Sequence, residues 1–110
     1  MDCIFCKIIK KEIPADIVYE DDQILAFKDR APSAPVHILF VPKKHIQSLV
    51  HADKGDESML GHLLLSIAET AKKLGIDERG FRVVTNNGKD GGQIVHHLHF
   101  HLLGGKKLGW

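Results

Sequence analysis

The most regular pattern in this sequence is an alternation of apolar and histidine residues over positions 97–103. A period of two is typical of a β-strand, whose successive side chains point to opposite faces. On such a strand His97, His99 and His101 would share one face, while the apolar residues between them would face the core. A helix would scatter the same side chains, because positions two apart do not share a helical face. The pattern therefore predicts a strand that carries both a packing surface and a candidate site.

Two helices and four further strands are expected elsewhere in the chain. Apolar residues recur at helical spacing over residues 59–74, with Asp53 as a capping residue and Gly75 as the residue that ends the helix. A shorter helix is expected at 3–10, with Asp2 as its N-cap. Strands are expected at 17–20, 23–28, 36–41 and 81–85, of which the first two form a hairpin.

These elements indicate one α+β domain that spans residues 1–110. Strands outnumber helices, and they follow one another as hairpins with one long helix inserted. This order favours an antiparallel sheet with the helices packed on one face. The apolar side of the histidine strand would then lie under the long helix. A chain of 110 residues is long enough to bury a substantial core as a single domain.

Composition and charge exclude several classes of partner. The chain is 44% hydrophobic and 26% charged, which is ordinary for a globular protein, and its formal net charge is +1. A charge so close to zero gives no electrostatic reason to expect binding to nucleic acid or to a membrane surface. The apolar runs are too short to span a bilayer, and the first residues lack a basic segment followed by an apolar one. A cytoplasmic location with reduced cysteines is therefore expected.

Three imidazoles side by side can support several kinds of chemistry. Imidazole acts as a nucleophile, an acid or base near neutral pH, a hydrogen-bond donor or a metal ligand. The stretch Gly91-Gly92-Gln93 leads into the histidine strand, and its backbone N–H groups could hold phosphate oxygens. Taken alone, strand histidines could be polar surface residues, and the glycines could form a plain turn. Their combination favours a site that holds an anion next to nucleophilic or acid–base groups.

The stretch from Gly91 to Leu103 resembles the histidine triad signature, His-φ-His-φ-His-φ-φ, in which φ is an apolar residue. Further segments are similar to the Hint branch of the histidine triad family, and together they cover essentially the whole chain in order. They are Ile8-Ile9-Lys10-Lys11-Glu12-Ile13-Pro14, Leu25-Ala26-Phe27, Ala34-Pro35-Val36-His37, Val41-Pro42-Lys43-Lys44-His45, Leu60-Gly61-His62 and Leu103-Gly104-Gly105. By this resemblance the chain is identified as a member of that family.

The resemblance implies a fold and a reaction. Family members are α+β proteins with a five-stranded antiparallel sheet, one long helix and one short helix. They form homodimers in which two sheets join into one of ten strands. They bind purine nucleoside monophosphates and hydrolyse nucleoside 5′-phosphoramidates, such as adenosine 5′-phosphoramidate and lysyl-AMP, through a covalent nucleotidyl-histidine intermediate. No cofactor is implied for catalysis.

The resemblance also implies roles for individual residues. His99 would be the nucleophile, and His101 would hold a phosphate oxygen and stabilise developing charge. His37 would complete the cluster, and His97 would orient the site. The substrate would be bound by Asp29 at the ribose, by Asn86, Gly92 and Gln93 at the phosphate, and by Trp110 near the partner subunit's site. From the residues alone, Asp29 could cap a turn, Asn86 could be a turn residue, and His37 could be an ordinary sheet histidine. Trp110 could equally belong to a frayed tail.

Three residues depart from the Hint pattern. Ile94 stands where that branch usually has a serine thought to help protonate the leaving amine, and isoleucine can neither donate nor accept a proton. His96 replaces an aromatic residue, and its place opposite the triad predicts a packing role. Arg30 replaces an apolar residue near the nucleobase, so the base preference could differ. His51 and His62, outside the motif, are expected to be surface or structural residues.

A second group of residues has metal-binding chemistry. Cys3 and Cys6 have the spacing of half a zinc site, although such a pair could also be buried core cysteines. Some histidine triad proteins hold a structural zinc ion with such a pair, the histidine of the Pro-Lys-x-His segment and the first triad histidine. That resemblance implies a structural zinc site formed by Cys3, Cys6, His45 and His97. It would tie the N-terminal helix to the sheet and leave His99 free.

Four hypotheses for the function follow. The leading one is a nucleoside phosphoramidase, and Leu103-Gly104-Gly105 after the triad favours the Hint branch over a dinucleoside polyphosphate hydrolase of the same family. A nucleotide-binding interaction protein with negligible turnover belongs to a different class. A metallohydrolase would instead use all three triad histidines as metal ligands.

Overall fold

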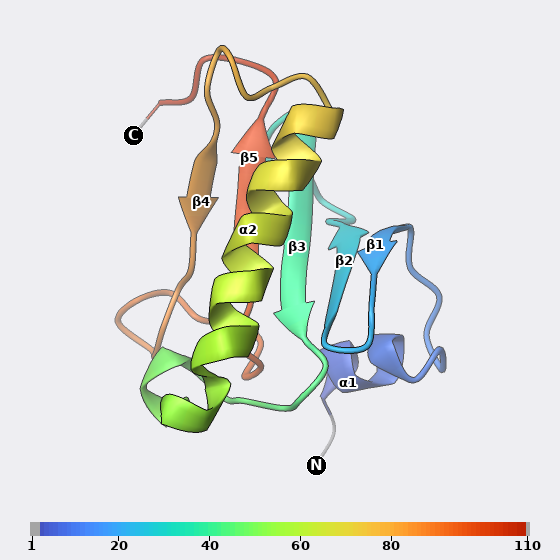
Figure 1. Ribbon diagram of the computed structural model, residues 1–110, viewed down its shortest axis with the longest axis vertical. Coiled ribbons are helices and arrows are strands. Elements are labelled where there is room, and N and C mark those ends of the chain that lie inside the picture. The colour runs from blue at the N-terminus through green and yellow to red at the C-terminus, as the bar shows by residue number, and fades with distance from the viewer. Residues whose placement is uncertain (1–2, 110) are drawn as a thin grey trace.

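The structure is a computed structural model that describes residues 3–109. Five strands form a single antiparallel sheet in the order β1-β2-β3-β5-β4. Their bounds are Ile17–Glu20 for β1, Ile24–Lys28 for β2, Val36–Pro42 for β3, Arg82–Val84 for β4 and Phe100–Gly104 for β5. The expected α+β fold with a five-stranded antiparallel sheet, one long helix and one short helix is therefore confirmed (Figure 1).

The long helix α2 (Glu57–Lys73) crosses one face of the sheet, as Figure 1 shows. A 3₁₀ turn at Lys54–Asp56 leads into it, and Asp53 caps this turn in a reciprocal capping box with Asp56. Gly75 follows the helix with φ at 73°, the left-handed conformation that glycine adopts without strain. A second 3₁₀ turn lies at Leu49–His51. Within residues 3–109, no helix has both the length and the apolar character needed to cross a membrane.

The short helix α1 (Ile4–Ile9) lies on the opposite face of the sheet from α2. The expectation that both helices pack on one face was therefore wrong. Side chains alternate along β2, so that Ile24 packs under α2 while its neighbour Leu25 packs under α1. The central strands are apolar on both faces because each face has its own helix to cover it.

Cys3 caps the N-terminus of α1. Its Sγ accepts a hydrogen bond of 3.3 Å from the backbone N–H of Cys6. Asp2, the expected cap, lies outside the described residues. Both cysteines of the Cys-x-x-Cys pair are therefore at the first turn of α1, where they can contact the end of the sheet.

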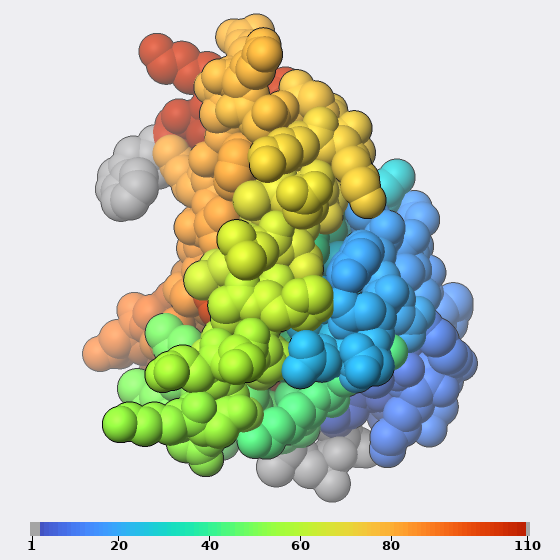
Figure 2. Space-filling view, viewed as in Figure 1, coloured from blue at the N-terminus to red at the C-terminus, as the bar shows by residue number. Residues whose placement is uncertain are grey.

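The larger core lies between α2 and the sheet. Leu98, Phe100 and Leu102 from the histidine stretch pack there with Leu63 and Ile67 of α2, and none of the five is more than 7% exposed. The expectation that the apolar side of this stretch lies under the long helix is confirmed. Figure 2 shows α2 covering the front of the molecule, with the β1–β2 hairpin beside it.

The histidine stretch is only partly a strand. β5 begins at Phe100, so His97 and His99 precede it, although the alternation predicted a strand through all three histidines. The segment before β5 has other partners: the backbone N–H of Leu98 donates to the carbonyl of Ile46 at 2.7 Å. Apolar burial preserves the alternation of side chains, while the backbone ladder that defines a strand is absent before Phe100.

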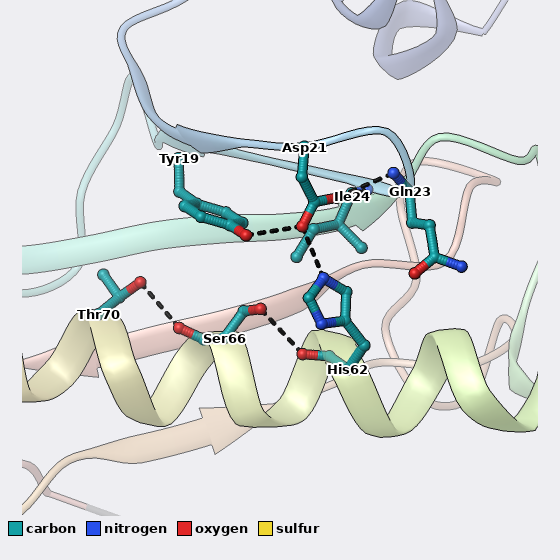
Figure 3. A network of polar contacts seen from close by, with 7 residues as sticks. All are labelled: Tyr19, Asp21, Gln23, Ile24, His62, Ser66 and Thr70. Atoms are coloured by element: carbon teal, nitrogen blue, oxygen red, sulfur yellow. Dashed lines mark hydrogen bonds and ion pairs between the residues drawn. The ribbon is translucent and has the colours of Figure 1, made fainter.

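A polar network joins the β1–β2 hairpin to α2 (Figure 3). One carboxylate oxygen of Asp21 accepts hydrogen bonds of 2.6 Å from the hydroxyl of Tyr19 and from Nε2 of His62. Its other oxygen accepts from two backbone N–H groups of the hairpin turn. On α2, Ser66 and Thr70 each donate to the carbonyl one turn earlier. The structural role expected for His62 thus has a specific form, a bond from the helix to the hairpin.

Candidate functional site

The ring of His99 is held in one tautomer by the backbone. Its Nδ1 lies 2.7 Å from the carbonyl oxygen of His97, and because a carbonyl only accepts, Nδ1 carries the proton. The carbonyl of His99 itself accepts a hydrogen bond of 2.8 Å from the hydroxyl of Thr85, just after β4. In its neutral form this ring presents the lone pair of Nε2 as a nucleophilic atom.

His37 and His101 form a hydrogen-bond relay beside His99. The backbone N–H of Ser33 donates to Nδ1 of His37 at 3.0 Å, so the proton of the neutral His37 ring is on Nε2. That Nε2 lies 2.9 Å from Nδ1 of His101 and donates to it. The remaining nitrogen of His101, Nε2, therefore carries a proton that can be donated to a ligand. The His101 ring centroid lies 5.1 Å from that of His99 and 5.2 Å from that of His37.

Burial keeps both relay histidines neutral. Desolvation lowers the pKa of His101 to about 4, with further lowering from His99 and His37 and opposition from Asp29. Desolvation also lowers the pKa of His37, again opposed by Asp29, whose Oδ2 lies 3.6 Å from Nε2 of His37. Both rings are therefore uncharged at neutral pH, which is the state that their relay of single donors and acceptors requires.

A pocket of about 720 Å³ opens on the α1 face of the sheet. Its walls are mostly apolar, and the ring of Phe5 stands edge-on to that of His99 with centroids 5.1 Å apart. Asp29 and Arg30 also line it. The pocket is lined by Ile4, Phe5, Ile8, Pro14, Ala15, Asp16, Phe27, Lys28, Asp29, Arg30, Leu39 and Val95. Its size and apolar walls suit a flat organic group such as a nucleobase.

The glycine-rich loop is tightly packed. A Cβ added to Gly91 would lie 2.3 Å from the carbonyl oxygen of Asn87, so only glycine fits there. Gly92 has φ at 81°, and Nδ2 of Asn86 donates to the carbonyl of Gly91 at 2.9 Å. Asn86 therefore holds the loop, the turn role that its residue type allowed. Asp29 likewise caps its turn, because its Oδ1 accepts from the N–H of Ala31 at 2.8 Å.

The side chain of Gln93 is hydrogen-bonded to the protein backbone. Its amide nitrogen donates to the carbonyls of Gln47 at 2.7 Å and Val95 at 3.0 Å, and its amide oxygen accepts from the N–H of Gly88 at 2.9 Å. The side chain is only 8% exposed. In this conformation both amide protons are used, so Gln93 shapes the loop rather than offering a donor to a ligand. Its neighbour Ile94 is 88% exposed.

Four potential metal ligands converge at the first turn of α1. Nδ1 of His97 lies 3.3 Å from Sγ of Cys3, 3.6 Å from Sγ of Cys6 and 3.1 Å from Nδ1 of His45. Nε2 of His97 donates to the carbonyl of Pro42 at 2.8 Å, which leaves Nδ1 with a lone pair that faces the two thiols. Desolvation lowers the pKa of His97, so this ring is neutral. The four residues can hold a metal ion.

The three triad rings do not converge on one metal position. In the described part of the chain, the potential ligand atoms form two groups, one with His97 and the two cysteines and one with Asp29, His37 and His101. His99 belongs to neither group. This arrangement disfavours a metallohydrolase in which all three triad histidines bind one metal ion.

Two histidines outside the site, His96 and His51, lie at the surface. His96 is exposed, so the expected packing role was wrong for this chain. His51 is exposed and lies 2.7 Å from the hydroxyl of Ser48, as a surface histidine would. Trp110 lies outside the described residues. Sequence reasoning missed Ser33, whose backbone N–H donates to the His37 ring, and Thr85, whose hydroxyl donates to the backbone carbonyl of His99. No sequence pattern marks such donors.

Residues 10–108 match the HIT domain family. An uncharacterized HIT-like protein of Synechococcus elongatus is 57% identical over 109 residues, covering 99% of this chain and 95% of the relative. A solved HIT family hydrolase from Legionella pneumophila is 45% identical, with a TM-score of 0.97 over 99% of this chain and 97% of that one. A histidine triad nucleotide-binding protein from Candida albicans is 36% identical, with a TM-score of 0.85 over 99% and 82% of the two chains. The chain belongs to the HIT (histidine triad) family.

Proposed function

We propose that this protein hydrolyses purine nucleoside 5′-phosphoramidates through a covalent nucleotidyl–His99 intermediate. The observation that carries the proposal is the 2.7 Å bond from Nδ1 of His99 to the carbonyl of His97, which leaves Nε2 unprotonated in the neutral ring. Two relatives support the more general proposal of a hydrolase that binds nucleotides, because one is named a hydrolase and the other a nucleotide-binding protein. The substrate class comes from the resemblance to the Hint branch.

The pocket on the α1 face would hold the nucleoside. A purine would lie against the rings of Phe5 and Phe27 and the side chain of Leu39. The carboxylate of Asp29 would accept from the ribose hydroxyls, since its Oδ2 has only the weak 3.6 Å contact to His37. The phosphate would then face His99 and the protonated Nε2 of His101. Gly92 would be part of the loop that contacts the phosphate, and hydrogen bonds made by the side chains of Asn86 and Gln93 would fix the shape of that loop.

The reaction would take place in two displacements. Nε2 of His99 attacks phosphorus, a P–N bond to the histidine forms, and the P–N bond to the amine breaks with its electron pair going to the leaving amine, which takes up a proton from solvent. Water then attacks phosphorus and releases a proton to solvent, the bond to His99 breaks with its electron pair returning to Nε2, and the nucleoside monophosphate leaves. His101 would donate to the non-bridging oxygens in both steps, and His37 would keep His101 in the donating tautomer.

The Cys/His cluster would hold a structural zinc ion. Two thiols and two imidazoles are the donor set that zinc prefers, and the hydrogen bond from His97 to Pro42 orients one ligand as in many zinc sites. With four protein ligands such a site is closed and supplies no catalytic water. Zinc would therefore fix α1 to the sheet and take no part in the displacements.

A homodimer is also proposed, on the α2 and β4 surface. β4 is the edge strand of the sheet, and Val83 on it is 40% exposed. Leu64 and Leu65 on α2 are 48% and 70% exposed. Apolar side chains next to an edge strand favour association with a second copy, which would extend the sheet to ten strands. Sedimentation should give a dimer for the wild-type protein and a monomer for Leu65→Glu.

Turnover of adenosine 5′-phosphoramidate in excess chelator tests the proposed function. We expect AMP to form in chelator with the wild-type protein, and His99→Ala to lose about 10⁴-fold in kcat while still binding AMP. His96→Ala, a neighbouring exposed histidine, is the matched control and should keep full activity. Equal turnover by wild-type protein and His99→Ala would contradict the covalent mechanism. Comparison with a dinucleoside polyphosphate separates the two enzyme branches of the family.

A further inference from the structure

One wall of the nucleoside pocket is built by α1 and the loop after it. Ile4, Phe5 and Ile8 of α1 line the pocket, and residues 14–16 continue the same wall. Residues of β2 and β3, which pair with each other in the sheet, also line the pocket. The width of the pocket therefore depends on how firmly α1 is held against the sheet.

α1 is too short to be stable by itself. It has six residues, and isolated helices shorter than roughly 12 residues are marginal in water. Two attachments hold it in place. One is the packing of Phe5 and Ile8 in the smaller core, and the other is its first turn, where Cys3 and Cys6 face His45 and His97. Thiols form only weak hydrogen bonds, so without a metal ion the second attachment is weak.

His97 links this cluster directly to the proposed nucleophile. Its ring joins the cysteines, and it is fully buried. Its carbonyl oxygen accepts a hydrogen bond of 2.7 Å from Nδ1 of His99. Phe5 reinforces the link, because its ring contacts the rings of both His97 and His99, at centroid distances of 6.0 and 5.1 Å. A change in the position of His97 therefore moves both the pocket wall and the acceptor that orients His99.

We propose that Cys3, Cys6 and His45 are positioning residues for the catalytic site: a metal ion held by them and His97 fixes α1 and the His97 carbonyl, and so sets nucleotide affinity and the orientation of His99. The proposal rests on the proposed function for the identity of the ligand, a purine nucleoside monophosphate. It gives the cluster a role beyond overall stability. Zinc occupancy would change substrate binding although zinc touches neither substrate nor phosphate.

Hydrogen exchange without nucleotide gives the most direct readout. The zinc-loaded protein is compared with chelator-treated protein, Cys6→Ser and His45→Gln. We expect the amides of residues 4–16 to lose protection when zinc is absent, while those of α2 and β3 keep theirs. The NMR signal of the Nδ1 proton of His99 should lose its hydrogen-bonded character in the same samples. Both changes should appear in His45→Gln, which lies outside α1 and the pocket.

AMP binding measured by calorimetry is the second readout. If the competent arrangement of α1 falls to about a tenth of the population without zinc, the apparent Kd rises about tenfold. Ile67→Val is the control for general destabilisation, because it removes a methyl group from the core under α2 and leaves the cluster intact. It should lower the melting temperature and leave the AMP Kd unchanged.

Several outcomes would overturn the coupling. Equal protection of residues 4–16 with and without zinc would do so, as would uniform loss of protection across α2 and β3, which marks a general structural site. A protein that takes up no zinc contradicts it too, and so does the same AMP Kd in loaded and zinc-free protein. If the loaded protein binds no AMP, the proposed function fails, while the exchange and NMR contrasts still decide the link between α1 and His99.

Discussion

His97 and His99 are joined by a hydrogen bond of 2.7 Å from Nδ1 of the second ring to the backbone carbonyl of the first. Both residues were expected on one strand, with His99 as the nucleophile and His97 as an orienting residue and zinc ligand. The His97 ring turns toward Cys3 and Cys6, and its backbone carbonyl orients the His99 ring. His97 therefore supports His99 through its carbonyl, while the rings of His99 and His101 lie next to each other.

The relay from His37 to His101 can be broken with one substitution. His37→Phe keeps a ring but leaves Nδ1 of His101 without its donor, so His101 can change tautomer and lose the hydrogen bond that we propose it donates to the phosphate. Loss of such a hydrogen bond to a charged group, about 1.5–3 kcal/mol, predicts a fall in kcat of roughly 10- to 100-fold. His101→Ala and the double variant should then show strongly non-additive losses in steady-state kinetics. Additive losses would mean that the two rings act independently.

The neutral state of His101 should make folding stability depend on pH. Its pKa is about 4 in the folded protein and near 6.5 when unfolded, so the unfolded chain binds more protons as the pH falls between these values. Stability is therefore fully present above pH 6.5 and is lost on acidification toward pH 4, by about 1–2 kcal/mol at pH 5. Urea titrations should show a smaller loss in His101→Asn and an unchanged one in the surface variant His51→Asn. The same pH dependence in both variants would contradict the assignment.

Asp21 should stabilise the hairpin–helix contact only when it is ionised. Partial burial acts to raise its pKa, but hydrogen bonds from Tyr19, His62 and two backbone N–H groups outweigh this and lower it well below its ordinary value. Its contribution is therefore present above about pH 4 and is lost as the pH falls further. Asp21→Asn should destabilise the protein by about 1–3 kcal/mol at pH 7. The difference from wild type in urea unfolding should shrink near pH 2, and a difference that is constant with pH would contradict this.

The fold could be predicted because the pattern of apolar residues and the resemblance to the family both indicated an α+β domain with an antiparallel sheet. The alternation around His97–Leu103 correctly assigned Leu98, Phe100 and Leu102 to the core under α2. The alternation placed the start of β5 too early, since β5 begins only at Phe100. A period of two indicates which side chains are buried, but not whether the backbone pairs with a neighbouring strand. The same limit explains His96, which follows the alternation and yet is exposed.

The face of the sheet that α1 covers, and the hydrogen-bond donors of the site, could not be predicted from the sequence. An apolar helix face indicates burial without saying which face of the sheet it covers, so the position of Phe5 against His99 was out of reach. The donors from Ser33 and Thr85 depend on loop geometry. By contrast, the Cys3, Cys6, His45 and His97 group was predicted as a set, because resemblance supplied the two histidines to the Cys-x-x-Cys spacing.

Ile94 offers a test of leaving-group chemistry. It is 88% exposed, so substitution should change stability by less than about 0.5 kcal/mol. Ile94→Ser restores a hydroxyl where the Hint branch usually has one. A well-positioned proton donor accelerates a reaction by roughly 10²- to 10⁴-fold. A partly aligned donor should therefore raise kcat about tenfold for alkylamine leaving groups. Ile94→Ala is the control without a hydroxyl, and an equal increase in both variants would show that side-chain size, not proton donation, is responsible.

The stereochemical course at phosphorus tests the covalent role of His99 most directly. One diastereomer of adenosine 5′-phosphorothioamidate is hydrolysed in ¹⁸O-labelled water, and the configuration of the product is determined. Two successive in-line displacements, first by Nε2 of His99 and then by water, predict overall retention. Inversion would show that water attacks phosphorus directly, and it would contradict a nucleotidyl–His99 intermediate.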